Sequence, residues 1–305
     1  MLIRYGCELS IFVNEPTPVL CLVDIHPERR PDIIEENTFR ASPAVPISDE
    51  RDVFGNRLRR LIASAGETVL RLSGYIADRG IPEVRDEVAP VLPVANLPVN
   101  ALTYLNGSRY CETDKLNAVA WRAFGHLPRN GALVQAICDF TNERITFDYQ
   151  RARSSRTALE AYEERAGVCR DFAHLAITLC RCLNIPARYA NGYLGDIGVP
   201  FNPAPMDFNA WFEVYLGGAW HTWDARHNQP RIGRLVIARG RDACDVPMLQ
   251  TFGSHQLKTF SVVTEEAGKA ASLSRAEPRQ EIVARDRLLR AERVFDPFHP
   301  QARLL

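Results

Sequence analysis

Residues 205–228 read PMDFNAWFEVYLGGAWHTWDARHN and have the pattern of a β-hairpin. Apolar and polar residues alternate on both sides of Gly217-Gly218, and both glycines accept the positive φ angles of a two-residue hairpin turn. The turn fixes the register, so Asn209 and Asp224 lie on one face of the hairpin as diagonal neighbours. In this arrangement a carboxylate orients a partner residue, which in turn addresses a nucleophile.

A cysteine upstream supplies the candidate nucleophile. Cys169 follows Gly167 and Val168 at the first turn of a helix predicted over GVCRDFAHLAITLCRCLN, which Pro186 ends. The positive end of the helix dipole favours a thiolate at this position and can lower the thiol pKa well below about 8.5. By position alone, Cys169 is better explained as a small buried residue, because free cysteine is among the most buried residue types. The neighbouring hairpin favours the interpretation of Cys169 as a nucleophile. Apolar residues at steps of three and four predict one buried stripe along this helix.

The remaining histidines and cysteines give no stronger site. His221 lies on the opposite face of the hairpin, and His174 points away from the thiol on its helix. His227 follows Asp224 by three residues, so it either curls back as an alternative base or serves in the following turn. Cys180 and Cys182 are two positions apart on a helix and point in different directions. We therefore expect buried thiols there, with no metal and no cofactor.

The rest of the chain divides into three predicted parts. Residues 1–107 contain short β-leaning runs, among them LSIFV, PVLCLVDI, TVLRLSGYIAD and PVLPVANLPV, which predict a β-sandwich-like domain. Residues 108–265 form the predicted core, with further helices in RNGALVQAICDFTNERI and SSRTALEAYEERAG. Ser155 or Thr157 caps the second of these, and Gly167 suits its end. Residues 266–305 are a charged tail, predicted to be an exposed helix or disordered and to be dispensable from about Ala267.

Composition narrows the class of protein. The 305 residues carry 37 basic and 37 acidic side chains, so no basic excess favours a nucleic-acid partner. Charges interrupt every apolar run near the start, which argues against a signal peptide, and no long uncharged stretch predicts a membrane segment. We expect a soluble cytoplasmic protein whose eight cysteines stay reduced.

Two segments together resemble the transglutaminase-like superfamily of the papain-like clan. They are ERAGVCRDFAHLAITLCRCLNIPARYANGYL and DFNAWFEVYLGGAWHTWDARHN, in the order found in that family. The resemblance implies an α+β fold in which a cysteine at a helix start packs on an antiparallel sheet. The β-rich first part is similar to the companion domain of bacterial members. The family's Cys, His, Asp triad places the nucleophile on Cys169 and the orienting acid on Asp224, while the base position falls on Asn209.

The asparagine leaves two functions open. An amide has no basic nitrogen, so Asn209 can neither take the thiol proton nor return it to a leaving amine. The first function is acyl transfer or hydrolysis of amide or isopeptide bonds through a Cys169 thioester, with Tyr149 as the candidate oxyanion donor. Its partner is a peptide or protein substrate, or a peptide-like small molecule. The second is a non-catalytic domain that binds a peptide or protein partner. The sequence does not decide the oligomeric state.

Overall fold

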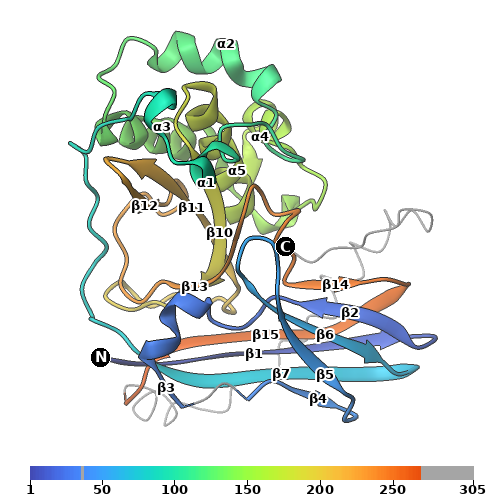
Figure 1. Cartoon of the computed structure of the whole chain (residues 1–305). Coiled ribbons are helices and arrows are strands. Elements are labelled where there is room, and N and C mark those ends of the chain that lie inside the picture. The colour runs from blue at the N-terminus through green and yellow to red at the C-terminus, as the bar shows by residue number, and fades with distance from the viewer. Residues whose placement is uncertain (36–37, 269–305) are drawn as a thin grey trace.

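Two antiparallel sheets contain the strands of the first part of the chain, and they lie one above the other as a sandwich (Figure 1). The computed structural model describes residues 1–35 and 38–268, so the predicted tail beyond residue 268 lies outside the described residues. The larger sheet runs in the order β15-β1-β7-β3, with β4 also paired to β7. Its strands are β1 (Leu2–Val13), β3 (Ile33–Glu35), β4 (Arg40–Ser42), β7 (Gly66–Ala77) and β15 (His255–Glu266).

The second sheet of the sandwich runs in the order β14-β2-β6-β5. Its strands are β2 (Thr17–Cys21), β5 (Ile47–Arg51), β6 (Arg57–Ala63) and β14 (Leu249–Thr251). The long strands alternate buried and exposed residues, as in β7, because one face packs on the other sheet. The predicted sandwich-like architecture of the first part of the chain is confirmed.

Two strands from the far end of the described chain complete this sandwich. β15 pairs with β1 from Ile3↔Glu266 to Val13↔His255, and β14 pairs with β2. Almost all residues of β14 and β15 belong to the predicted second part of the chain. The division after residues 107 and 265 therefore stays a prediction, and strand pairing crosses it.

The core sheet runs in the order β12-β11-β10-β13 and is antiparallel throughout. Its hairpin has the predicted register, from Leu216↔Ala219 to Phe212↔Trp223. Gly217 and Gly218 have φ angles of 58° and 96°, which side chains disfavour and glycine accepts. The strands are β10 (Ala187–Tyr193), β11 (Asn209–Leu216), β12 (Ala219–Trp223) and β13 (Leu235–Gly240).

Helices gather around one helix, α5, which packs against β10 and β11 (Figure 1). The helices are α1 (Val99–Leu102), α2 (Thr113–Phe124), α3 (Gly131–Arg144), α4 (Ala158–Glu164) and α5 (Cys169–Cys182), with short 3₁₀ turns η1 (Pro27–Asp32), η2 (Val94–Asn96) and η3 (Tyr149–Arg151). The α+β class is confirmed. Across the described ranges, 1–35 and 38–268, no helix has the length and apolar character needed to cross a membrane.

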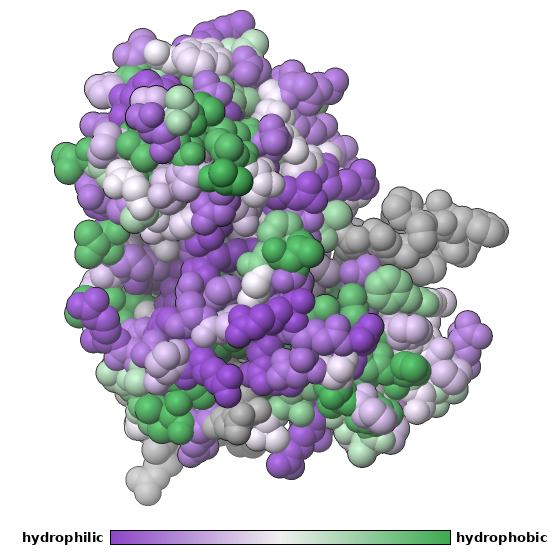
Figure 2. Space-filling view, in the orientation of Figure 1, coloured by the Kyte–Doolittle hydropathy of each residue, from purple (hydrophilic) through white to green (hydrophobic). Residues whose placement is uncertain are grey.

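Every residue of α5 is buried, not only the predicted apolar stripe. Several of its polar groups are hydrogen-bonded to distant segments. The Arg181 guanidinium donates to the carbonyls of Ala187, Asn106 and Arg241, and His174 Nε2 accepts the Ala243 N–H at 3.1 Å. A periodic pattern cannot reveal such partners, because they come from remote parts of the sequence. The visible surface between the helical part and the sandwich is mainly hydrophilic (Figure 2).

Two local expectations were wrong. The run PVLPVANLPV forms no strand: Pro90 makes one isolated bridge to Asn130, and η2 follows, because prolines remove the donors that a ladder needs. Gly167 does not end α4, which stops at Arg165 in a left-handed conformation with a φ of 53°. Gly167 instead lies in β9 (Ala166–Gly167), paired in parallel with β8 (Thr146–Phe147). Thr157, one of the two predicted caps, accepts the Glu160 N–H.

Candidate active site

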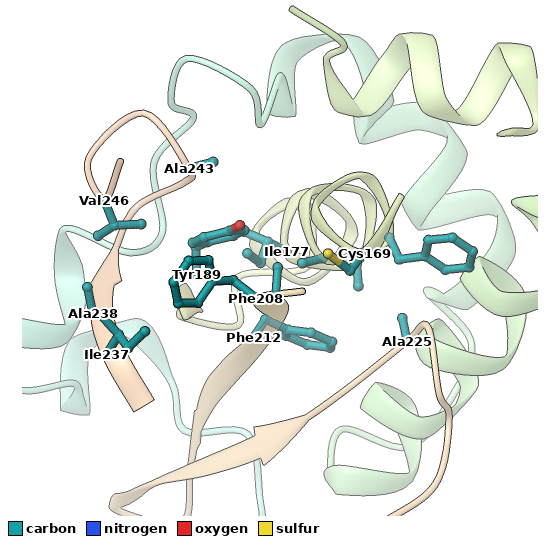
Figure 3. Close-up of a cluster of buried hydrophobic side chains, with 14 of the residues drawn as sticks. Cys169, Ile177, Tyr189, Phe208, Phe212, Ala225, Ile237, Ala238, Ala243 and Val246 are labelled. Carbon is teal, nitrogen blue, oxygen red and sulfur yellow. The ribbon is translucent and has the colours of Figure 1, made fainter. Parts of the chain in front are cut away.

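Cys169 is the first residue of α5, and a buried carboxylate fixes this end of the helix. The Val168 N–H donates to Asp171 Oδ2 at 2.9 Å, and Arg156 Nη1 donates to the same oxygen at 3.1 Å. The Cys169 side chain retains 9% of its exposure. It belongs to a buried apolar cluster that also contains Phe208 and Ala225 (Figure 3). The nucleophile is thus held on a rigid element at the edge of the core.

The Cys169 thiol is protonated at neutral pH in this environment. Burial raises its pKa to about 11, and the nearby Asp207 carboxylate raises it as well. The Arg226 guanidinium and a hydrogen bond from the Ala210 N–H lower it. The expected lowering of this pKa by the helix end is therefore corrected, because removal of the thiol from water outweighs the groups that favour the thiolate.

Asn209, at the position of the missing base, holds Arg226 beside the thiol. Its Oδ1 accepts from Arg226 Nη1 at 2.9 Å, and its Nδ2 donates to the Asp207 carbonyl at 3.1 Å. The Arg226 guanidinium lies 3.9 Å from the ring centroid of Phe147. The predicted register thus brings Asn209 and Arg226 together, although the sequence pattern gave no role in the site to Arg226.

Asp224 orients a histidine, but that histidine comes from the loop and not from β11. Its Oδ2 lies 2.8 Å from His227 Nδ1 and 3.0 Å from Arg234 Nη2, while Oδ1 accepts the N–H groups of Arg226 and His227 at 2.9 and 3.0 Å. Burial alone would raise the pKa of Asp224, but Arg234 and His227 hold it well below its usual range. The expected hydrogen bond from Asn209 to Asp224 is absent from these contacts, because the loop after β12 folds back onto the carboxylate.

The loop that carries His227 is tied to α3. Asn142 Nδ2 donates to the carbonyls of Ala225 and Arg226 at 2.9 and 2.8 Å, and Asn228 donates to Asp139 at 2.7 Å. The structure therefore pairs His227 with Asp224 in a loop that α3 holds in place.

Tyr149, the candidate oxyanion donor, lies beside the same carboxylate. Its hydroxyl is 3.5 Å from Asp207 Oδ2, the long limit of a hydrogen bond, and its ring packs edge-on against Phe147 at 4.8 Å. Tyr149 is 42% exposed, so this side of the site is open to solvent. The Cys169 and Asp207 charges both contribute to a raised Tyr149 pKa, after burial, which places the three groups in one neighbourhood.

Asp207 belongs to the site although it was not among the predicted residues. Burial raises its pKa to about 6, although Arg226 and the Tyr149 hydroxyl lower it. A signal for it was present in the sequence, since Asp207 stands two residues before Asn209, just ahead of β11. The site as observed therefore combines Cys169, Asp207, Asn209, Arg226 and Tyr149, with the His227–Asp224 pair beside it.

Comparison with known proteins agrees with this geometry. Residues 122–225 match the family described as the Transglutaminase-like superfamily. The solved structure of a "Putative Cysteine Protease from Cytophaga hutchinsonii" superposes with a TM-score of 0.75 and 29% identity, covering 88% of this chain and 91% of that one.

Two curated relatives are uncharacterized mycobacterial proteins. The protein from Mycobacterium leprae is 26% identical over 59% of this chain and 60% of its own length. The protein from Mycobacterium bovis is 32% identical over 45% of this chain and 47% of its own. The chain thus matches less than two thirds of the length of these relatives. The matched family and the superposition agree on one conclusion: the core of this protein, residues 122–225, is a transglutaminase-like domain.

Proposed function

We propose that this chain is a cysteine-dependent enzyme that hydrolyses or transfers the acyl group of amide or isopeptide bonds through a thioester on Cys169. One observation carries the proposal: Cys169 is the first residue of α5, which packs against β10 and β11, and although burial raises the pKa of its thiol, the Arg226 guanidinium and the Ala210 N–H lower it. Both favour the sulfur as it gains negative charge. The transglutaminase-like core and a neighbour described as a cysteine protease support this function.

The residues around the thiol supply distinct parts of the chemistry. Attack of the sulfur on a carbonyl carbon creates an oxyanion, which needs preorganised donors. The first N–H groups of a helix have no intrahelical acceptor, so the Cys169 N–H is one such donor and the Tyr149 hydroxyl is the other candidate. Asn209 acts by holding the Arg226 guanidinium in place and not by moving a proton.

We infer the substrate class from the exposure of the same residues. Tyr149 is half-exposed and Cys169 is almost buried, so only the acyl group has to reach the thiol while the rest of the substrate stays outside. Peptides, proteins or peptide-like small molecules that present a glutamine, lysine-linked or backbone amide fit this description. We place the enzyme in the cytoplasm, where its eight cysteines stay reduced.

A second function has its own supporting observation. Asn209 occupies the base position, and burial keeps Cys169 protonated, as in a domain that only binds. In that case the same opening holds a peptide or protein partner without cleaving it. The two functions differ in whether Cys169 is needed for turnover.

Turnover by wild type and Cys169→Ala tests the proposal. Purified protein is incubated with a glutamine peptide and a primary amine, and mass spectrometry follows both the hydrolysed and the amine-linked product. We expect wild type to form at least one product and Cys169→Ala to form neither. Binding of the peptide without any product, with equal affinity for both proteins, would favour the binding function instead.

A further inference from the structure

We infer that Arg226 determines substrate specificity by binding a carboxylate that the substrate carries next to the scissile amide. The inference rests on the proposed function and narrows its substrate class to amides with an acidic group near the reacting carbonyl. It starts from a guanidinium that is held in place and keeps contact with solvent. Across the described ranges, 1–35 and 38–268, this guanidinium contacts no carboxylate.

The Arg226 side chain is fixed on two sides. Its Nη1 donates to Asn209 Oδ1 at 2.9 Å, and its Cζ lies 3.9 Å from the ring centroid of Phe147. The contact with Asp224 is made by the Arg226 backbone N–H, at 2.9 Å, and not by the guanidinium. A flat cation that lies on the face of a ring keeps its edge available for a planar anion.

The charge of Arg226 is left uncompensated, in contrast to the arginines of the neighbouring sheet. Arg188 and Arg239 both form ion pairs with Glu213. The Nε and Nη2 of Arg226 form no hydrogen bond within the part of the chain that the structure describes. Neither is among the fully buried polar atoms that lack a partner, so both keep contact with solvent. A half-buried guanidinium with free donors is suited to bind a carboxylate from outside.

Backbone pairing places this guanidinium beside the start of α5. Phe147, whose ring lies against Arg226, pairs with Gly167, and Gly167 is two residues before Cys169. Ala225, the residue before Arg226, belongs to the same buried cluster as Cys169 (Figure 3). The contribution of Arg226 to the Cys169 pKa agrees with this placement. A carboxylate bound to Arg226 therefore holds the adjoining part of the substrate close to the thiol.

A single carboxylate suits this place better than a dianion such as phosphate. The Asp207 carboxyl, which lies 3.5 Å from the Tyr149 hydroxyl, already adds negative charge on this side of the site. The fork formed by Nε and Nη2 of a guanidinium matches the two oxygens of a carboxylate. In peptides such a group comes from an aspartate or glutamate side chain or from the free C-terminus.

Two peptides that differ only beside the reacting residue test the inference. Each contains one glutamine, flanked on both sides by glutamate in the first peptide and by methionine, of similar length but uncharged, in the second. We expect wild type to have a kcat/KM about 10–100-fold higher for the glutamate peptide, the range that one charge-assisted hydrogen-bonded pair produces. Arg226→Gln should remove this preference. The ratio is the readout, because Arg226 also lowers the thiol pKa and its loss slows the reaction of both peptides.

Two further variants serve as controls. Arg226→Lys keeps the charge but lacks the planar fork, so it should retain only part of the preference. Arg144→Gln makes the same chemical change at an arginine with a similar setting on α3. Arg144 lies 4.0 Å from the ring centroid of Tyr162 and donates to the carbonyl of that residue at 2.9 Å. Its replacement should leave the ratio as in wild type.

Binding to Cys169→Ala separates the inference from the proposed function. Calorimetry on this variant should show tighter binding of the glutamate peptide, and adding Arg226→Gln should remove the difference. If turnover depends on Cys169 but wild type shows no preference, or Arg226→Gln keeps it, the inference is wrong and the proposed function stands. If no product depends on Cys169 but the binding preference depends on Arg226, the proposed function is wrong and the carboxylate site belongs to the binding function. Equal binding of both peptides without turnover would reject both claims.

Discussion

Among the single residues of the site, Asn209 stands at the position of the base and still forms hydrogen bonds there. The asparagine accepts one hydrogen bond from Arg226 and donates one to the Asp207 carbonyl, so both of its polar groups are used. The result is a cation held next to a thiol, with a carboxylate of raised pKa beside them. Arg226 and Asp207 thus act in opposite directions on the pKa of the Cys169 thiol.

Asn209→His should lower the pH at which the Cys169 thiol ionises. An imidazole at this position would pair with the sulfur, so Cys169 should react with iodoacetamide at neutral pH, whereas the wild-type rate should keep rising toward the thiol pKa of about 11. Turnover should rise by about 10²–10⁴-fold if the imidazole also serves as acid and base. Peptide mapping separates Cys169 from Cys244, the one cysteine with partial exposure among those that the structure describes.

Asn209→Ala is the control for this change, because it removes the amide and adds no base. The prediction is wrong if Asn209→His and Asn209→Ala show the same pH profile of alkylation. A double variant, Asn209→His with His227→Ala, frees Asp224 to orient the new imidazole and should react at the lowest pH of the series.

At the scale of elements, the hairpin and the helix start could be predicted, and their polar surroundings could not. Two glycines fix the register of β11 and β12 as far as Phe212↔Trp223, and Arg226, in the loop beyond β12, donates to Asn209 through its side chain. The position of Cys169 at the first turn of α5 also follows from local pattern. The partners of Asp224 and the burial of α5 on all sides depend on loops that fold back from remote segments, and no local periodicity encodes them.

Asp171→Ala should destabilise the element that carries the nucleophile. It removes the acceptor for the Val168 N–H and leaves Arg156, itself almost fully buried, without one of its carboxylates. Removal of one partner of a buried ion pair costs about 3–5 kcal/mol, so the urea midpoint should fall clearly. Asp171→Asn keeps one acceptor oxygen and should lose less stability than Asp171→Ala.

Asp114→Ala is the matched control, since Asp114 also lies in the first turn of a helix but is well exposed. Asp114→Ala should lower the free energy of unfolding by less than about 1 kcal/mol. Equal urea midpoints for Asp171→Ala and Asp114→Ala would show that the buried cap contributes nothing special.

At the scale of the whole molecule, strand pairing and buried charge join the core to the sandwich. Glu213 of β11 accepts from Arg188 at 2.6 Å and from Arg239 at 2.8 Å, and Arg239 also reaches Glu28 near η1. β15 returns from the core to pair with β1. The sequence indicated a β-rich first part, but a pairing between residues 3 and 266 lies beyond what local pattern can predict, because no turn connects the two strands.

Glu213→Ala should weaken the molecule in a manner that depends on pH. Burial would raise the pKa of Glu213, but Arg239 and Arg188 lower it below its ordinary value of 4.5. Its contribution is therefore present above about pH 4.5 and declines as the pH falls through the lowered pKa. We expect a loss of about 3–5 kcal/mol near pH 7 and a smaller difference from wild type in acid. Exposed Glu163→Ala, measured alongside, should change stability by less than about 0.5 kcal/mol at any pH.

Two truncated chains should show how much β15, and how much the residues after it, contribute to the stability of the fold. A chain ending at Gly268 retains all of β15, and its melting temperature should match the full chain within about 2 °C, less than the shift that roughly 1 kcal/mol produces at this size. A chain ending at Ser254 lacks β15 and leaves β1 with an unpaired edge, so it should fail to fold or aggregate. A loss of several degrees in the longer of these two chains would mean that the charged tail supports the fold.

The proposed function depends on a thioester at Cys169, which mass spectrometry of the digested protein detects. Wild type is mixed with a p-nitrophenyl ester of a short acyl peptide, quenched in acid and digested for mapping. We predict a mass increase of one acyl group on the peptide that contains Cys169, its removal by hydroxylamine, and no adduct on Cys169→Ala. An unmodified Cys169, or an adduct that maps to Cys244 in both proteins, would contradict the account.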